Sequence, residues 1–141
     1  MPSVLKLVRN LLMNWSVAGW TERTIPQPPP NPPALPTCIV TCVAGTNVGQ
    51  RVWFKPGETV SVGRLAACNA LVPSTDMIIS KRHCLITYNA QKQRFIVTDV
   101  STNGTYMQNG KRLRYNQPEQ IVPGSILYLA REHIIIQLVA T

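Results

Sequence analysis

Beyond residue 37, apolar residues alternate with polar ones in short runs, the pattern of half-buried β-strands. Turn signals such as Pro56-Gly57 and Asn109-Gly110 separate these runs, and no long helical period appears. Many short strands in about 100 residues predict an all-β sandwich or barrel, and without an internal repeat one sandwich is the simpler choice. The expected strands are Cys38–Val43, Arg51–Phe54, Thr59–Val62, Cys84–Tyr88, Phe95–Asp99, Thr105–Met107, Ser125–Leu129 and Ile134–Val139.

The first 25 residues follow a different pattern. Apolar residues recur at helical spacing between Val4 and Trp20, which predicts a short amphipathic helix. Lys6 and Arg9 interrupt the apolar run and leave too little for a membrane span, and no cleavage site of a signal peptide follows. The segment is either an anchor to a membrane surface or larger complex, with Trp15 and Trp20 as contacts, or a tail without a partner.

Residues 26–37 are expected to be a proline-rich linker. Seven of the eleven residues from Pro26 to Pro36 are proline, which lacks an amide donor and favours extended polyproline II. A spacer is the preferred interpretation, and a ligand for an SH3 or WW domain is the alternative. The folded domain should therefore span residues 38–141.

The charge balance points to an anionic partner. The chain has fourteen Lys and Arg residues and six Asp and Glu residues, which gives a formal net charge of +8. Nucleic acid, phosphorylated protein and acidic lipid all fit such a charge, as does a surface that is simply basic. Aromatic residues make up only 6% and are not interleaved with basic ones, which argues against a nucleic-acid binder. The dense basic cluster Lys111-Arg112-Leu113-Arg114 is interpreted as a solvated hairpin.

Catalysis, cofactors and metals are not expected. The chain has two histidines, no glycine-rich nucleotide loop and no paired carboxylates. Cys38 and Cys42 lie on one predicted strand face, and Cys84 follows His83 directly, so neither pair has the turn spacing of a zinc site. Together with Cys68 these thiols are expected to be ordinary buried cysteines in a reducing compartment, which suggests a cytoplasmic protein.

Three polar loops interrupt the apolar scaffold. Gly63-Arg64 closes one strand, Ser80–His83 opens another, and Asp99–Thr105 joins two strand-like runs with more hydrogen-bonding groups than a simple turn needs. Strand ends gather at two poles of a sandwich, so distant loops can share a rim. A guanidinium, an ammonium, hydroxyls and amides at one rim would suit a tetrahedral oxyanion.

Gly63-Arg64, then Ser80-x-x-His83, then Thr102-Asn103-Gly104-Thr105, in that order and spacing, resemble the forkhead-associated (FHA) domain. The resemblance covers about residues 38–139. It implies a β-sandwich of about eleven short strands whose apical loops bind phosphothreonine peptides. On that basis the chain is expected to be a non-enzymatic module for phosphorylation-dependent protein–protein interaction in signalling or assembly. Its partner would be a Thr-phosphorylated substrate of a Ser/Thr kinase.

The resemblance also implies roles for single residues. Arg64 would pair with the phosphate, Ser80 would donate its hydroxyl to another phosphate oxygen, and Lys81 would contact the phosphate directly. Thr102 would shape the phosphothreonine subsite, and Asn103 would hydrogen-bond the peptide backbone.

Gly63, His83 and Gly104 would be structural, the glycines by permitting tight turns and His83 by tying loops together. The apolar run Met77–Ile79 suggests an apolar preference at the third residue after the phosphothreonine. The alternative function is a phosphate-independent structural subunit that docks through its sheet face or its N-terminal helix.

Overall fold

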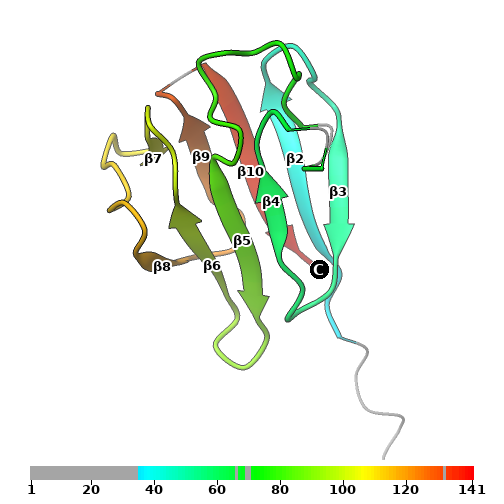
Figure 1. Ribbon diagram of the computed structural model, residues 1–141. Helices are drawn as coiled ribbons and strands as arrows, with labels where there is room; N and C mark the ends of the chain where they lie inside the picture. The colour runs from blue at the N-terminus through cyan, green and yellow to red at the C-terminus, as the bar shows by residue number, and fades with distance from the viewer. Residues whose placement is uncertain (1–34, 66, 69–70, 132) are drawn as a thin grey trace, which may run out of the picture. The chain divides into compact units, whose positions relative to one another are not determined.

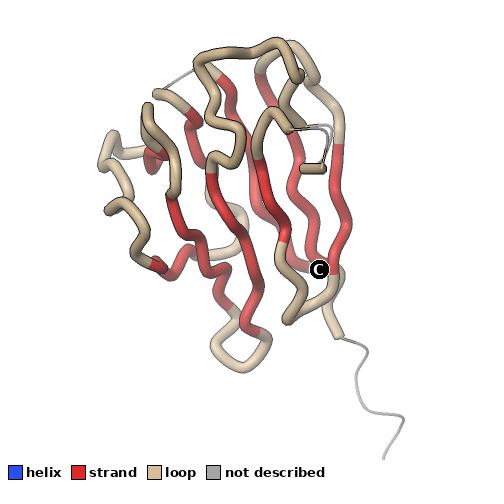
Figure 2. The backbone as a smooth tube through the Cα atoms, in the orientation of Figure 1, coloured by secondary structure: helices blue, strands red, loops and turns tan. Residues whose placement is uncertain are grey.

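The computed structural model describes residues 35–65, 67–68, 71–131 and 133–141. Over these residues the chain forms nine strands in two antiparallel sheets and no helix (Figures 1 and 2). The strands are β2 (Cys38–Ala44), β3 (Arg51–Phe54), β4 (Val60–Val62), β5 (Cys84–Asn89), β6 (Arg94–Asp99), β7 (Thr105–Met107), β8 (Pro118–Ile121), β9 (Ile126–Leu129) and β10 (Ile134–Ala140).

The two sheets have the strand orders β3-β2-β10-β9-β7 and β4-β5-β6-β8. They face one another in Figure 1, and their inner faces form the core. Alternation produces this arrangement: on β5 the side chains of Cys84, Ile86 and Tyr88 are buried while their neighbours are half-buried. The ring of Tyr88 packs edge-on against Phe95 of β6, with ring centroids 4.8 Å apart. The expected β-sandwich is confirmed.

The described domain closes where its two ends meet. The amide of Thr141 donates to the carbonyl of Thr37 at 3.0 Å, and the amide of Thr37 lies 3.4 Å from the Thr141 hydroxyl. The expected helix within residues 1–25 and the linker up to residue 34 lie outside the described residues. No helix long and apolar enough to span a membrane occurs within the described part of the chain.

Two segments of the described chain have a structure that the sequence did not predict. Strand β8 was not expected, because Pro118-Glu119-Gln120 is polar and only Ile121 is buried; it lies at a sheet edge, where polar residues and proline are tolerated. Residues 100–104 join β6 to β7 across the two sheets, so the segment is a crossing loop rather than a hairpin turn. Gly104 has a φ of 97°, as the turn signal suggested, but Asn103 is not among the residues with positive φ.

Three of the four cysteines are buried free thiols, as expected. Cys38 and Cys42 lie on the inner face of β2, and Cys84 lies on that of β5. Burial raises the pKa of Cys38 and Cys42, which keeps these thiols protonated and unreactive. Cys68 is half-exposed in the β4–β5 connection, so the expectation of a buried thiol was wrong there.

Candidate functional site

The three polar loops of the sequence meet at one end of the sandwich, at the top of Figure 1. The amide of Arg64 donates to the carbonyl of Ser80 at 3.3 Å, and the amide of His83 donates to the carbonyl of Val62 at 2.7 Å. The β6–β7 loop joins them through Val100, whose amide donates to the carbonyl of His83 at 3.0 Å. Backbone pairing therefore fixes the relative positions of the loops.

Arg64 is held by its own neighbours and keeps most of its donors free. Its Nε donates to the carbonyl of Ile79 at 2.9 Å, which orients the guanidinium. No carboxylate of the described residues lies within 4.0 Å of it. The two Nη groups therefore form an oriented fork with no anionic partner in the described chain, the donor geometry that phosphate and carboxylate favour.

Ser80 and Thr102 tie the two loops together at the same point. The amide of Thr102 donates to Oγ of Ser80 at 2.9 Å, so the serine oxygen accepts one hydrogen bond while its own proton remains available to donate. The amide of Ser80 in turn donates to Nδ1 of His83 at 3.2 Å. Thr102 itself is exposed.

His83 is fully buried and links both loops. Because Nδ1 accepts from Ser80, the proton is on Nε2, which donates to the carbonyl of Gly104 at 2.7 Å. Burial lowers the pKa of His83, although the Gly104 carbonyl and the Asp99 carboxylate oppose the shift; the nearby Arg112 adds to it. A neutral imidazole with one fixed tautomer therefore spans the base of the site.

Asn103 and Lys81 lie at the surface of the same region. Nδ2 of Asn103 donates to the carbonyl of Ile78 at 2.8 Å, which joins the β6–β7 loop to the residues before Ser80. Lys81 is exposed and contributes its backbone carbonyl to the amide of Leu65 at 3.3 Å.

The two expected turn glycines are required for different reasons. A Cβ on Gly63 would lie 2.8 Å from the carbonyl carbon of Lys81, so Gly63 permits close backbone approach rather than a left-handed turn. Gly104 has positive φ, and a Cβ there would lie 2.7 Å from the ring of Tyr106 and 2.9 Å from Nε of Arg112.

Asp99 shapes the β6–β7 loop from inside. Its buried Oδ1 accepts hydrogen bonds from the amide of Ser101 at 3.1 Å, from the Ser101 hydroxyl at 2.6 Å and from the Thr105 hydroxyl at 2.9 Å. Oγ of Ser101 also accepts from the amide of Gly104 at 2.7 Å. The excess of polar groups in Asp99–Thr105 is thus largely used to fix the loop conformation.

These loops surround an open cavity of about 430 Å³. The five residues expected to bind a phosphopeptide, Arg64, Ser80, Lys81, Thr102 and Asn103, all line it. Gly63, His83 and Gly104 are buried beneath the surface. Sequence reasoning missed Arg82 as a lining residue, although its position between Lys81 and His83 was a signal. Among the described residues the lining consists of Arg64, Met77, Ile78, Ile79, Ser80, Lys81, Arg82, Val100, Thr102 and Asn103, none of which is acidic.

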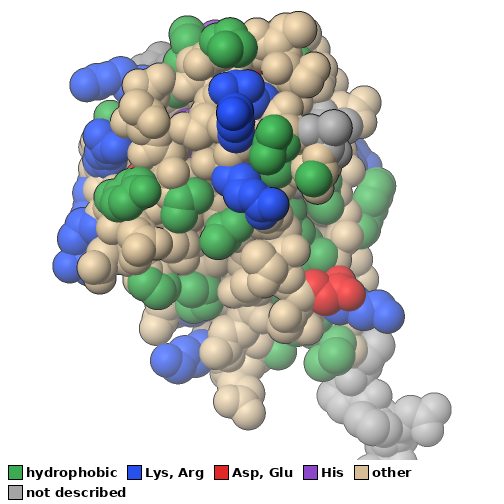
Figure 3. All heavy atoms as spheres, in the orientation of Figure 1, with side chains coloured by type: hydrophobic (Ala, Val, Ile, Leu, Met, Phe, Trp, Pro, Cys, Tyr) green, Lys and Arg blue, Asp and Glu red, His purple; other side chains and the backbone are tan. Residues whose placement is uncertain are grey.

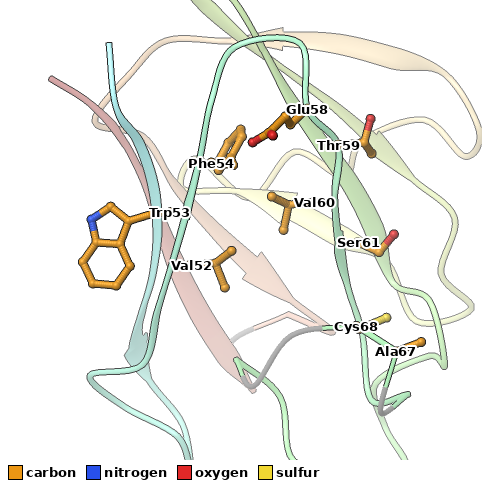
Figure 4. Close-up of a pocket in the computed structure, with 9 residues that line it drawn as sticks. All are labelled: Val52, Trp53, Phe54, Glu58, Thr59, Val60, Ser61, Ala67 and Cys68. Carbon is orange, nitrogen blue, oxygen red and sulfur yellow. The ribbon is translucent and has the colours of Figure 1, made fainter. Parts of the chain in front are cut away.

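A second cavity of similar size, about 440 Å³, lies between β3 and β4 (Figure 4). The described residues that line it include Glu58 and no Lys or Arg, so it does not suit an anion. Among the described residues no three His, Cys, Asp or Glu side chains gather in a way that could hold a metal ion. Figure 3 shows Lys and Arg side chains over the upper and left parts of the face in view and also near its lower end, where the most prominent acidic side chain lies beside one of them.

Comparison with known proteins identifies the family. The model of the FHA domain matches residues 60–130. The probable serine/threonine-protein kinase fhkA of Dictyostelium discoideum is 32% identical over 87 residues, which cover 57% of this chain and 14% of that kinase. The chain therefore matches only a small part of that curated relative.

Solved structures agree in fold. The FHA domain of a hypothetical protein of Arabidopsis thaliana has a TM-score of 0.61 at 26% identity, covering 74% of this chain and 86% of that one. The FHA domain of the CT664 protein of Chlamydia trachomatis has a TM-score of 0.59 at 23% identity, covering 73% and 96%. The MEK1 FHA domain in complex with a HOP1 phosphothreonine peptide has a TM-score of 0.58 at 21% identity, covering 72% and 94%. With more than half of its length matched by the family model and this shared fold, the chain belongs to the FHA domain family.

Proposed function

We propose that this domain binds phosphothreonine peptides at the cavity between the β4–β5 and β6–β7 loops. The observation that carries the proposal is the fixed orientation of the Arg64 guanidinium and its lack of a carboxylate partner among the described residues. The guanidinium is oriented by the carbonyl of Ile79 at 2.9 Å and has no carboxylate of the described residues within 4.0 Å. The described residues that line its cavity include none that is acidic. An oriented cation of this kind favours a dianionic ligand over a neutral one.

The division of labour follows from the donors available. The Nη groups of Arg64 bind two phosphate oxygens, and the hydroxyl of Ser80 donates to one of them while accepting from Thr102. Lys81 contributes a mobile point charge. The exposed amide of Asn103 exchanges its bond with the Ile78 carbonyl for bonds to the peptide backbone, which selects an extended chain.

Relatives support this function. Structures of similar fold include an FHA domain studied for phosphothreonine-dependent interactions and an engineered FHA domain with a Myc-pTBD peptide. By analogy the protein acts as an adaptor that recruits a partner marked by a Ser/Thr kinase, and binding rather than catalysis is its role. It works in the cytoplasm, and residues 1–25 attach it to a membrane surface or a larger complex.

Peptide selectivity would come from the apolar end of the cavity. Met77 is 73% exposed and Ile78 is 47% exposed, and both line the cavity beside Ser80. An apolar side chain three residues after the phosphothreonine would cover this surface, whereas an acidic one would find no cation among these two residues.

A phosphate-independent docking role is the second candidate. Trp53 is 58% exposed on β3, an edge strand, and its indole points away from the cavity into which Val52 and Phe54 project (Figure 4). Exposed tryptophan on an edge strand is typical of protein–protein contacts.

The test is a calorimetric titration with a phosphothreonine peptide and its unphosphorylated twin. The phosphopeptide should bind at least about tenfold more tightly, and Arg64→Ala should remove that difference. Arg94→Ala is the matched control, because the Arg94 guanidinium donates to the carbonyls of Lys92 and Gln93 at the opposite end of β6. Equal affinity for both peptides, or an unchanged difference in Arg64→Ala, would overturn the proposal.

A further inference from the structure

A second basic cluster contacts the β6–β7 loop through Arg112. The guanidinium carbon of Arg112 is 6.0 Å from the ring centroid of Tyr106, and that of Arg131 is 5.4 Å from the same centroid. Two cations therefore share one aromatic ring, each within cation–π range. We call Tyr106, Arg112 and Arg131 the tyrosine–arginine cluster.

The cluster is fastened to the loop that lines the candidate site. Nη2 of Arg112 donates to the carbonyl of Thr102 at 3.4 Å. The amide of Ala130 donates to the carbonyl of Gly104 at 2.8 Å, which fixes the turn that carries Arg131. Thr102 thus donates its amide to Ser80 and accepts a hydrogen bond from Arg112 through its carbonyl. The expectation that Arg112 belongs to a solvated hairpin misses this contact.

Both arginines lack an anionic partner in the described chain. The ion pairs nearby involve Lys111 and Arg114, which both bind Glu119, and no described carboxylate lies within 4.0 Å of Arg112 or Arg131. Holding two like charges at one ring is unfavourable in the free protein. Stacking leaves the N–H edges of a guanidinium free to bind an anion, so a bound anion would relieve the repulsion.

We propose that the tyrosine–arginine cluster is a second anion subsite, which binds a second phosphate or carboxylate side chain of the same peptide. The inference rests on the proposed function, because the first phosphate at Arg64 sets the register. The partner class is thus a multiply phosphorylated segment, or a phosphothreonine segment with acidic residues nearby. Two guanidinium groups around one ring match a single dianionic side chain better than the extended backbone of a nucleic acid.

The spacing follows from the geometry at Thr102. Ser80 and Arg112 bond to the amide and the carbonyl of the same residue, Thr102, at 2.9 Å and 3.4 Å, so Oγ of Ser80 and Nη2 of Arg112 lie within about 10 Å of each other. An extended peptide advances about 3.3–3.6 Å per residue, which places the second anion roughly two to four residues from the phosphothreonine. The experiment below decides whether the second anion lies before or after the phosphothreonine in the peptide.

The experiment compares singly and doubly phosphorylated peptides with the full chain. A phosphothreonine peptide is paired with versions that carry phosphoserine, or glutamate, at each position two to four residues before and after it. The dissociation constant of each is measured by calorimetry for the native protein and for Arg131→Gln, Arg112→Gln and the control Arg94→Gln. At one or more positions other than the third after the phosphothreonine, where Met77 and Ile78 are expected to select an apolar residue, the second phosphate should tighten binding about tenfold, and the glutamate less.

The ratio of the dissociation constants of the singly and doubly phosphorylated peptides should fall to near one in Arg131→Gln and Arg112→Gln and stay unchanged in Arg94→Gln. No gain at any spacing, or a gain that survives Arg131→Gln, would overturn the second subsite. The proposed function would still stand if the affinity for the singly phosphorylated peptide depends on Arg64. Equal binding of the phosphorylated and unphosphorylated peptides would overturn both proposals. A gain lost equally in Arg94→Gln would also overturn the subsite, because it would report only the overall charge.

Discussion

The amide of Thr102 donates to the hydroxyl oxygen of Ser80 at 2.9 Å, across 22 residues of chain. Together with the bonds from Val100 to His83 and from Asn103 to Ile78, it holds the β6–β7 loop against the β4–β5 connection. The Ser80 oxygen uses one lone pair to accept this bond. The serine proton is therefore directed away from Thr102, and the cavity that both residues line is the place where it can find an acceptor.

Ser80→Ala should weaken binding of a phosphothreonine peptide by roughly tenfold or more, because it removes both a phosphate donor and the bond that positions the Thr102 loop. The free energy of unfolding should fall by about 1 kcal/mol, the typical worth of one hydrogen bond. Calorimetry and denaturant unfolding measure the two effects. Ser74→Ala, exposed in the same connection, is the control. A phosphopeptide affinity of Ser80→Ala equal to that of the native protein would count against a phosphate contact.

Gly104→Ala and Gly110→Ala separate backbone strain from crowding. Both glycines have similar positive φ, 97° and 89°, but a Cβ at Gly110 meets nothing within 4 Å whereas one at Gly104 meets Tyr106 and Arg112. Gly110→Ala should cost about 1 kcal/mol of unfolding free energy, and Gly104→Ala roughly 1–3 kcal/mol more. Thermal and urea unfolding of both variants measure the difference. Equal losses would show that the packing around Gly104 yields easily.

His83 should make the domain sensitive to mild acid. Burial lowers the pKa of His83 in the folded state, so the unfolded chain binds a proton more readily. The free energy of unfolding is therefore unaffected above the ordinary histidine pKa of about 6.5 and falls as the pH drops below it toward the folded value.

The measurement is unfolding in urea between about pH 7.5 and pH 5, compared with His83→Asn, which lacks the titrating group but retains His133. The native protein should lose stability more steeply on acidification than the variant. In the native protein, NMR at about pH 6 should show a neutral His83 ring, protonated on Nε2. Parallel pH profiles, or a charged ring under those conditions, would contradict the assignment.

The apolar surface of Met77 and Ile78 should select peptides by their third residue after the phosphothreonine. In an oriented library with phosphothreonine fixed, Leu, Ile or Met should be enriched there over Asp, by an amount that a few buried methylene groups explain, roughly tenfold. Ile78→Arg should reverse the preference toward Asp. Selection of Asp by the native domain would rule the interpretation out.

The sequence predicted the strands whose side chains alternate between core and surface, because burial leaves a period of two in β2, β5, β6 and β10. It missed β8, whose edge position removes that constraint and leaves Pro118-Glu119-Gln120 without an apolar pattern. The loop Asp99–Thr105 was recognised as more than a turn, yet its passage between sheets was not visible, since strand pairing is set by distant residues.

The candidate site shows the same limit. Residues in the motifs around Arg64, Ser80 and Asn103 line one cavity. The cavity forms because backbone hydrogen bonds join the loops that contain these motifs. Arg112 lies outside those motifs, and only the folded chain brings it to the carbonyl of Thr102. A basic side chain on a hairpin gives the same sequence pattern whether it faces solvent or a neighbouring loop.

The most direct test of the phosphate site is an NMR titration of the isotope-labelled protein with a phosphothreonine peptide, which reports every responding amide together with the Arg64 Nε–H and the Trp53 indole. We expect the largest shifts at Arg64 Nε–H, Ser80, Thr102 and Gly104, no comparable shift with the unphosphorylated twin, and an unmoved Trp53 indole on the exposed face of β3. Shifts centred on Trp53 and the β3–β4 cavity, equal for both peptides, would contradict the phosphate site and support docking through the sheet instead.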